Sequence, residues 1–191
     1  DKTGTLTHGR LALERVVALG GASETDVLRA ALMASEPDPF DPLETALERA
    51  ATERGLDATG LHANPLVRDP PFDPERRLVP HVWREPDGLR VYATGARGRV
   101  LDAAGARGAE RDRAKAENAA LAAAGMRVLG IAAGTLSSSD GTRAADEGAL
   151  ALLGLVAFSD PVRPGVAESL AECRAAGIRV ILITADHPAT A

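Results

Sequence analysis

The first seven residues of the chain, Asp1-Lys-Thr-Gly-Thr-Leu-Thr7, combine a carboxylate with a lysine, a glycine and threonine hydroxyls. An aspartate carboxylate can act as a nucleophile and carry a covalent phosphoryl group. Hydroxyl groups, backbone N–H groups and an ammonium group are what such a phosphoryl oxyanion requires around it. A Gly/Thr turn in which Asp1 only caps a helix uses the same residue types, so the motif alone leaves both interpretations open.

A second polar group, Thr184-Ala-Asp186, directly follows an apolar run near the end of the sequence. In open parallel sheets, ligands gather beyond the carboxyl ends of the strands, where a Thr hydroxyl and backbone N–H groups can hold a phosphate. The alternative is an ordinary strand-to-helix turn capped by Asp186. We expect His187 to belong to this turn, because no second His or Cys stands at metal-ligand spacing.

The elements that must position these groups begin with a strand, predicted by alternating apolar residues over 10–19. Ser23 with Asp26 three residues on predicts the N-terminus of a helix. A second helix is predicted from Asp41 as N-cap and Pro42 as the first helical residue.

Glu44 stands three residues after Asp41, so it is predicted to complete a capping box of that second helix. Residues 57–63 are predicted to be a polar connection.

The middle of the chain favours antiparallel strands at residues 66–68, 77–84 and 89–94. The turn signal at 85–88 joins the last two into a hairpin. Pro80 cannot donate a ladder hydrogen bond, so it indicates an edge strand or a bulge.

Helices are predicted next at 95–104 and 106–124, and strands at 126–133 and 149–158. The intervening residues 135–148 are rich in Ser, Gly and Asp and are predicted to be a surface loop.

The end of the chain has a different pattern. Val166, Leu170 and Cys173 share one face of a predicted helix that ends at Gly177. The uninterrupted apolar run 178–184 then predicts a buried strand of a parallel sheet. Hairpins in the middle and a helix-then-strand pattern at the end predict two domains.

Composition places the 191-residue chain among globular proteins, with 45% hydrophobic and 26% charged residues. A net charge of -5 argues against nucleic acid as a partner. Cys173 is the only cysteine, which excludes an internal disulfide and suits a reducing compartment. No run approaches the roughly 18 apolar residues of a membrane span.

Taken together, the motifs resemble those of P-type ATPases, the pumps that drive ions or lipids across membranes. Residues 1–7 look like their phosphorylation motif. Asp160-Pro-Val-Arg163 resembles their Asp-Pro-Pro-Arg hinge motif, with Val162 in place of the second proline. Thr184-Ala185-Asp186 resembles their Thr-Gly-Asp phosphate motif, and residues 183–191 continue much as they do in ion-pumping members.

The resemblance extends to the segment between these motifs. Residues 72–77 are similar to a stretch whose phenylalanine stacks on adenine and whose basic residue lies near the nucleotide. An aromatic face beside a guanidinium suits a purine and its phosphates. Taken alone, Phe72 would be a core residue, and Arg76 and Arg77 would be solvated.

Thr94-Gly-Ala-Arg97 aligns with a Lys-Gly-Ala-Pro segment of the family, so the nucleotide-site lysine is replaced by Thr94. A threonine can form a hydrogen bond but supplies no cation, which implies weaker affinity or compensation by an arginine such as Arg76 or Arg97. The resemblance implies a nucleotide site made of Glu44, Phe72, Arg76, Arg77, Thr94, Gly95, Arg127, Asp160 and Arg163. It implies a catalytic site made of Asp1, Lys2, Thr3, Thr184 and Asp186, with Mg²⁺ at Asp1 and the Thr3 carbonyl.

We therefore expect an α/β fold in which an antiparallel nucleotide-binding domain with flanking helices, residues 9–157, is inserted in a partial phosphorylation domain. Residues 1–8 and 158–191 would form that Rossmann-like domain of the haloacid-dehalogenase type. The resemblance implies a monomeric portion, on the cytoplasmic face of a bacterial cell membrane, of a cation pump that uses ATP. Its partners would be nucleotide and the remainder of the pump.

The Phe72 motif, and the lack of a His-Pro pair in the nucleotide-binding region, favour the calcium/sodium-pump-like branch of the family. The fragment itself is expected to bind nucleotide weakly without turnover. One alternative is a soluble phosphatase of the same dehalogenase type with a cap domain, which usually has a second Asp where Thr3 stands. The other alternative is a non-catalytic nucleotide-sensing module.

Overall fold

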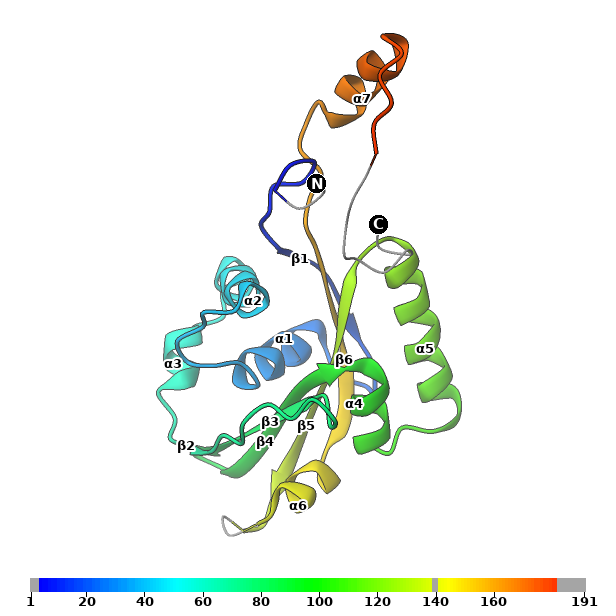
Figure 1. Ribbon diagram of the computed structural model, residues 1–191. Coiled ribbons are helices and arrows are strands. Elements are labelled where there is room, and N and C mark those ends of the chain that lie inside the picture. Colours follow the sequence, from blue (N-terminus) through cyan, green and yellow to red (C-terminus); the bar gives the residue numbers. More distant parts are fainter. Residues whose placement is uncertain (1–3, 139–140, 182–191) are drawn as a thin grey trace.

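The computed structural model describes residues 4–138 and 141–181, and its strands form one central sheet (Figure 1). The elements are, in chain order, β1 (Ala12–Ala18), α1 (Glu24–Met33), α2 (Pro42–Glu53), α3 (Ala58–His62), β2 (Leu66–Arg68), β3 (Leu78–Glu85), β4 (Gly88–Ala96), α4 (Arg97–Ala103), α5 (Gly108–Ala123), β5 (Arg127–Leu136), α6 (Arg143–Gly148), β6 (Ala151–Ser159) and α7 (Val166–Ala175).

The sheet has six strands in the order β1-β6-β5-β4-β3-β2, and every neighbouring pair is antiparallel. Figure 1 shows α1, α2 and α3 on one side of it and α4 and α5 on the other. The expected α/β fold class, with an antiparallel sheet and flanking helices, is confirmed.

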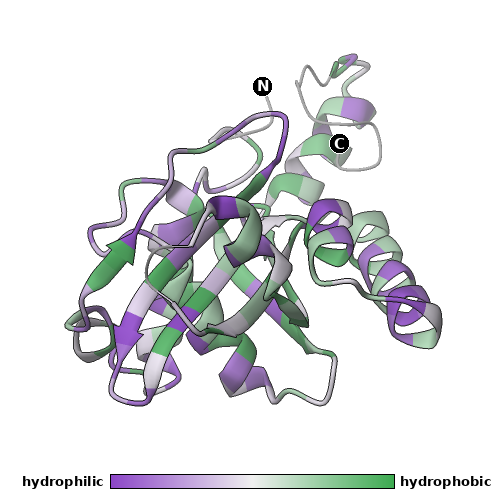
Figure 2. Ribbon diagram, turned by 90° about the horizontal axis from the view of Figure 1, so that it is seen from below, coloured by the Kyte–Doolittle hydropathy of each residue, from purple (hydrophilic) through white to green (hydrophobic). Residues whose placement is uncertain are grey.

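Two apolar cores lie on the two faces of this sheet. Successive strand residues point to opposite faces, so Trp83 belongs to the core beneath α1 and α2, and Val82 belongs to the core beneath α4. On the second face, α5 buries only Ala114 and Leu121. Figure 2 shows hydrophilic and hydrophobic bands alternating along this helix.

The N-terminus of α1 is as predicted, whereas that of α2 differs from the prediction in one hydrogen bond. The capping box of Ser23 and Asp26 at α1 is confirmed. At α2, Asp41 is the N-cap and accepts a hydrogen bond from the Leu43 N–H at 2.7 Å. The predicted role of Glu44 in a capping box is wrong, because its carboxylate accepts instead from the backbone N–H of Glu36, at 3.4 Å, in the loop before the helix.

The predicted hairpin is confirmed as β3 and β4, with Glu85 opposite Gly88. The edge strand β2 is only three residues long and pairs with Val82 and Trp83. Pro80 therefore lies on a stretch of β3 that β2 does not cover, as predicted for a residue without an N–H.

Two short helices lie in segments predicted to be irregular. In the first, α3, Asp57 caps the helix by accepting from the Gly60 N–H at 2.9 Å. In the second, α6, Thr142 accepts from the Ala145 N–H at 3.3 Å. Neither helix is long enough for an apolar period to appear in the sequence.

Helix α7 lies where it was predicted, but none of its residues is buried. It extends away from the sheet in Figure 1. Residues 178–181 do not form the predicted strand, because a parallel strand requires neighbours and no described strand lies beside them. Residues 182–184 lie outside the described residues, so the parallel sheet and the division into two domains stay predictions.

Candidate functional site

Two adjoining cavities, of about 230 and about 460 Å³, form one groove beside α2. Small-ligand pockets span about 300 to 1,000 Å³, so this space is adequate for a nucleotide-sized ligand. Five residues line both cavities: Asp41, Glu44, Phe72, Val79 and Thr94. We call the combined space the groove.

The floor of the groove is apolar. Leu129 and Ile131 of β5 and Val156 and Phe158 of β6 line the smaller cavity. Phe72 lines both cavities, and 64% of its surface is exposed. An apolar slot with an accessible aromatic ring at its side is suited to a planar ring system. The sequence marked the four floor residues only as members of apolar strands.

Glu44 supplies a half-buried carboxyl group to the groove. Burial raises its pKa, and the nearby carboxylates of Glu36 and Asp41 act in the same direction. The hydrogen bond from the Glu36 N–H lowers the pKa and only partly offsets these effects. The group can accept a hydrogen bond when ionised and donate one when protonated.

Thr94 and Gly95 are neighbours on β4, and both line the smaller cavity. Gly95 pairs with Leu78. A Cβ atom at position 95 would lie 2.4 Å from the carbonyl oxygen of Arg77, so no side chain fits there. Gly95 thus has a packing role as well as its predicted place at the nucleotide site. The structure brings together four of the nine predicted nucleotide-site residues: Glu44, Phe72, Thr94 and Gly95.

Arg76 and Arg77 do not line the groove, although they follow Phe72 closely in the sequence. The Arg76 Nη1 atom lies 2.9 Å from a carboxylate oxygen of Glu147 in α6. The Arg77 Nε atom donates to the carbonyl of Pro74 at 3.3 Å. Their contact with nucleotide stays a prediction, and for Arg76 it requires exchange of its carboxylate partner.

Helix α6 braces the loop that carries Phe72. Arg143 forms an ion pair with Glu147 at 2.9 Å and donates to the carbonyls of Pro71 at 3.1 Å and Leu78 at 2.7 Å. These two carbonyls flank the loop on both sides. No sequence pattern predicted this helix, and therefore none predicted the brace.

Asp160 and Arg163 lie at a neck where residues 4–10 run beside residues 160–163. The Asp160 carboxylate accepts from the Thr7 hydroxyl at 2.5 Å and from the Arg10 N–H at 3.1 Å. Arg163 donates to the carbonyls of Thr7 and Gly4, both at 2.8 Å. In the structure both residues tie two chain segments together, and neither lines the groove.

Arg127 is exposed at the start of β5, opposite Phe158 of β6, and does not line the groove. The predicted catalytic and metal-binding residues lie outside the described residues: Asp1, Lys2, Thr3, Thr184 and Asp186.

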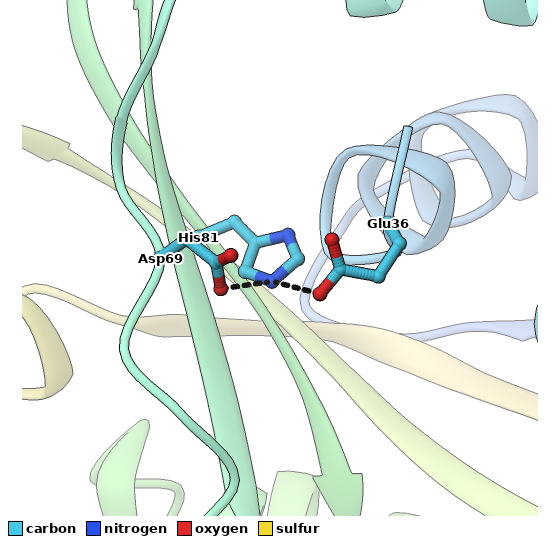
Figure 3. A group of neighbouring side chains, drawn as sticks. All are labelled: Glu36, Asp69 and His81. Atoms are coloured by element: carbon cyan, nitrogen blue, oxygen red, sulfur yellow. Dashed lines mark ion pairs between the residues drawn. The ribbon is translucent and has the colours of Figure 1, made fainter. Parts of the chain in front are cut away.

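The groove also contains a group that sequence patterns did not predict, made of Glu36, Asp69 and His81 (Figure 3). The His81 Nε2 atom lies 3.2 Å from Asp69 Oδ1 and 3.9 Å from Glu36 Oε1. Burial lowers the pKa of His81, against the opposite effect of the two carboxylates. No sequence spacing could have revealed the group, because its members come from three separate segments.

Comparison with known proteins identifies the class to which this fold and groove belong. The model of the family described as P-type ATPase, cytoplasmic domain N, matches residues 40–165, which is more than half of the chain. The chain therefore belongs to the P-type ATPase family. The matched residues include the whole groove apart from its wall at residues 34–36.

Two of the individual relatives are named as cation transporters. The chain is 39% identical over 162 residues to a probable cation-transporting ATPase F of Mycobacterium tuberculosis, covering 79% of this chain and 18% of the relative. It is 35% identical over 142 residues to the sodium/potassium exporting P-type ATPase cta3 of Schizosaccharomyces pombe, covering 69% of this chain and 14% of that protein. The chain thus spans less than a fifth of the length of either relative.

Among solved structures, a zinc-transporting PIB-type ATPase matches with a TM-score of 0.65. Sequence identity is 20%, and the match covers 100% of this chain and 26% of that one. At this identity the likeness concerns the fold alone. Within the described residues, no helix has the length and apolarity needed to cross a membrane.

Proposed function

We propose that this chain is the ATP-binding part of a P-type cation-transporting ATPase and that the groove receives the adenine base. The observation that carries the proposal is the convergence of Glu44, Phe72, Thr94 and Gly95 on one apolar groove. These residues come from three separate segments of the sequence, and the family resemblance predicts each of them as a nucleotide-site residue.

Each wall of the groove would have a distinct role. The ring of Phe72 would stack on the purine, which is favourable because both faces are apolar and polarisable. The Glu44 carboxyl group and the Thr94 hydroxyl would form hydrogen bonds at the rim. The described lining of the groove contains no lysine or arginine, so the phosphates would extend beyond it and affinity would be weak.

In the whole pump, a carboxylate oxygen of Asp1 would attack the γ-phosphorus of ATP in line, the bond from that phosphorus to the β–γ bridging oxygen would break, and ADP would leave while Asp1 carries the phosphoryl group. Lys2, Thr184 and Asp186 would surround the phosphoryl oxygens. The Asp1 carboxylate and the Thr3 carbonyl are oxygen donors of the kind that Mg²⁺ prefers, and the ion would neutralise charge on the phosphates. We further propose that residues 1–8 and 158–191 belong to this phosphorylation domain, of the haloacid-dehalogenase type, and residues 9–157 to the nucleotide-binding domain.

The remaining partners follow from the same proposal. The rest of the pump would supply the membrane helices and the other part of the phosphorylation domain. The fragment would be a monomer on the cytoplasmic face of a bacterial cell membrane. The names of the two relatives described above, a cation-transporting ATPase and a sodium/potassium exporting ATPase, favour this proposal over the soluble-phosphatase alternative.

Titration of the chain with ATP, ADP and AMP, followed by NMR, tests nucleotide binding. We expect saturable shifts for Phe72, Thr94 and Gly95 with all three ligands. Phe72→Ala should weaken binding at least about tenfold, as expected for loss of an aromatic stacking contact. Ile178→Ala, which also truncates an exposed apolar side chain, serves as the control and should have no effect. Absence of any nucleotide binding would refute the proposal.

Steady-state ATP hydrolysis tests the expectation that the fragment does not turn over. We expect no hydrolysis above background for the chain or for Asp1→Asn. Hydrolysis that depends on Asp1 would show that the fragment contains a complete catalytic site.

A further inference from the structure

We propose that Glu36, Asp69 and His81 bind a divalent transition-metal ion, such as Zn²⁺, and that this ion supplies the positive charge the groove lacks. The three side chains line the larger of the two cavities. Figure 3 shows them facing one another from the loop after α1, the connection after β2, and β3 itself.

The spacing of the three side chains suits a metal ion. One potential ligand atom from each residue lies within 4.8 Å of the other two. Metal–ligand bonds of about 2.1 Å at tetrahedral angles place ligand atoms about 3.4 Å apart. The observed distances from His81 Nε2, 3.2 Å to Asp69 and 3.9 Å to Glu36, bracket that value. Small rotations of two partly exposed carboxylates would complete the geometry.

The imidazole of His81 is a second indication of a bound ligand, independent of the carboxylates. Its side chain is 1% exposed. Neither ring nitrogen makes a hydrogen bond of good geometry within the described part of the chain. A buried polar group without such a bond is costly. Coordination through Nε2 would satisfy it, and neutral imidazole is the form that binds metals.

The negative charge of the groove indicates what a bound metal ion would do there. Its described lining contains four carboxylates, from Glu36, Asp41, Glu44 and Asp69, and no lysine or arginine. Such a surface repels phosphate groups. A divalent ion bound by two of these carboxylates would neutralise their charge, reduce the repulsion and leave open coordination positions facing the cavity.

The donor set favours one group of metals. Two carboxylates and one imidazole suit Zn²⁺, Ni²⁺ or Fe²⁺ better than Mg²⁺ or Ca²⁺, which prefer oxygen ligands alone. Co²⁺ takes the same ligands as Zn²⁺ and absorbs visible light, so it is a direct probe of coordination.

Metal binding is tested by titrating the chelator-treated chain with Co²⁺ and recording its visible absorption, and with Zn²⁺ by calorimetry. We expect one ion per chain. Glu36→Gln, Asp69→Asn and His81→Gln should each weaken binding at least about tenfold. Asp38→Asn removes a charge from the same loop as Glu36 but not from the cluster, so it should bind like the unchanged chain.

Circular dichroism of each variant establishes that it is folded. Because Glu36 and Asp69 are partly exposed, their variants carry the test even if His81→Gln does not fold. Absence of 1:1 Co²⁺ binding would overturn the proposal. Binding that is unchanged in both folded carboxylate variants would also overturn it, because the ion would then be elsewhere.

The effect on charge rests on the proposed nucleotide function and has its own test. With the site loaded with Zn²⁺, the affinity for AMP should rise about tenfold, whereas uncharged adenosine should bind equally with and without the metal. Equal AMP affinity in both states would overturn the charge effect. If neither ligand binds in either state, the nucleotide function fails, and the Co²⁺ result still decides the metal site.

Discussion

Thr94 is a single side chain that limits how well the groove can bind phosphate groups. It lines both cavities, and its hydroxyl can form hydrogen bonds but cannot balance the charge of a phosphate. The carboxylates around it worsen the imbalance. At the scale of single residues, the groove is therefore well formed for a base and poorly formed for the phosphates.

Thr94→Lys should strengthen the binding of ATP about tenfold, or about 1.4 kcal/mol, because it places an ammonium group in the groove. NMR titration or calorimetry measures the change. Thr25→Lys adds the same charge at an exposed position on α1, and it controls for the change in net charge. Equal gains in the two variants would show that the effect is one of net charge alone.

Glu44→Gln should alter the dependence of stability on pH. The pKa of Glu44 is raised in the folded state, mainly by burial. Its stabilising contribution is thus complete below the ordinary pKa of about 4.3 and is lost as pH rises through the folded-state value. Glutamine resembles the protonated acid, so the variant should gain stability relative to the unchanged chain as pH rises above about 4.3.

Urea unfolding of both proteins across this range measures the free-energy difference. Glu53→Gln, at the exposed end of the same helix, is the matched control. A difference between Glu44→Gln and the unchanged chain that stays constant with pH would contradict the prediction.

At the scale of elements, α6 determines where the Phe72 loop lies. The helix has only six residues, and its ion pairs and hydrogen bonds reach both sides of that loop. The groove wall is therefore expected to depend on α6, which does not itself line the groove.

Arg143→Ala should destabilise the fold by about 2 kcal/mol, because it leaves the Pro71 and Leu78 carbonyls without this donor and removes an ion pair. Nucleotide affinity should fall several-fold, since the Phe72 loop is no longer held. Urea unfolding and NMR titration measure the two effects. Arg113→Ala on the exposed face of α5 is the control.

Nucleotide affinity that stays unchanged in a folded Arg143→Ala variant would show that the loop holds its place without α6.

Only some of the elements and site residues could be predicted from the sequence. The β3–β4 hairpin was predictable because period-two strands flank a Pro-Asp-Gly turn. Helix α6 was not, because six residues show no period. Glu44, Phe72 and Thr94 were found through a family pattern. Glu36, Asp69 and His81 converge from separate segments, and a lone histidine in a strand gives no signal by itself.

At the scale of the whole molecule, the neck joins the first described residues to the segment after β6. Thr7 pairs with Val162, and the polar contacts of Asp160 and Arg163 reinforce that bridge. The family resemblance assigned both residues to the nucleotide site, whereas the structure gives them a mechanical role. The two roles predict different results on mutation.

Arg163→Ala should increase amide hydrogen exchange at residues 4–10 and leave the affinity of the groove for AMP unchanged, because the Arg163 side chain donates to the carbonyls of Thr7 and Gly4 at the neck. Exchange detected by NMR and a parallel AMP titration provide the measurements. Arg174→Ala on α7 is the control. A large loss of AMP affinity would restore the predicted nucleotide role of Arg163.

The order of the strands determines how this unit can be inserted into a longer protein. The first strand, β1, and the last, β6, are adjacent, so the chain enters and leaves the sheet at one edge. Neighbouring strands are about 4.8 Å apart. The two ends of the unit are therefore as close together as the ends of a hairpin loop. A protein that contained this unit as an insertion would need only that small separation at the point of insertion. A unit of this kind can be transplanted, or permuted by opening the chain elsewhere, without stretching the host.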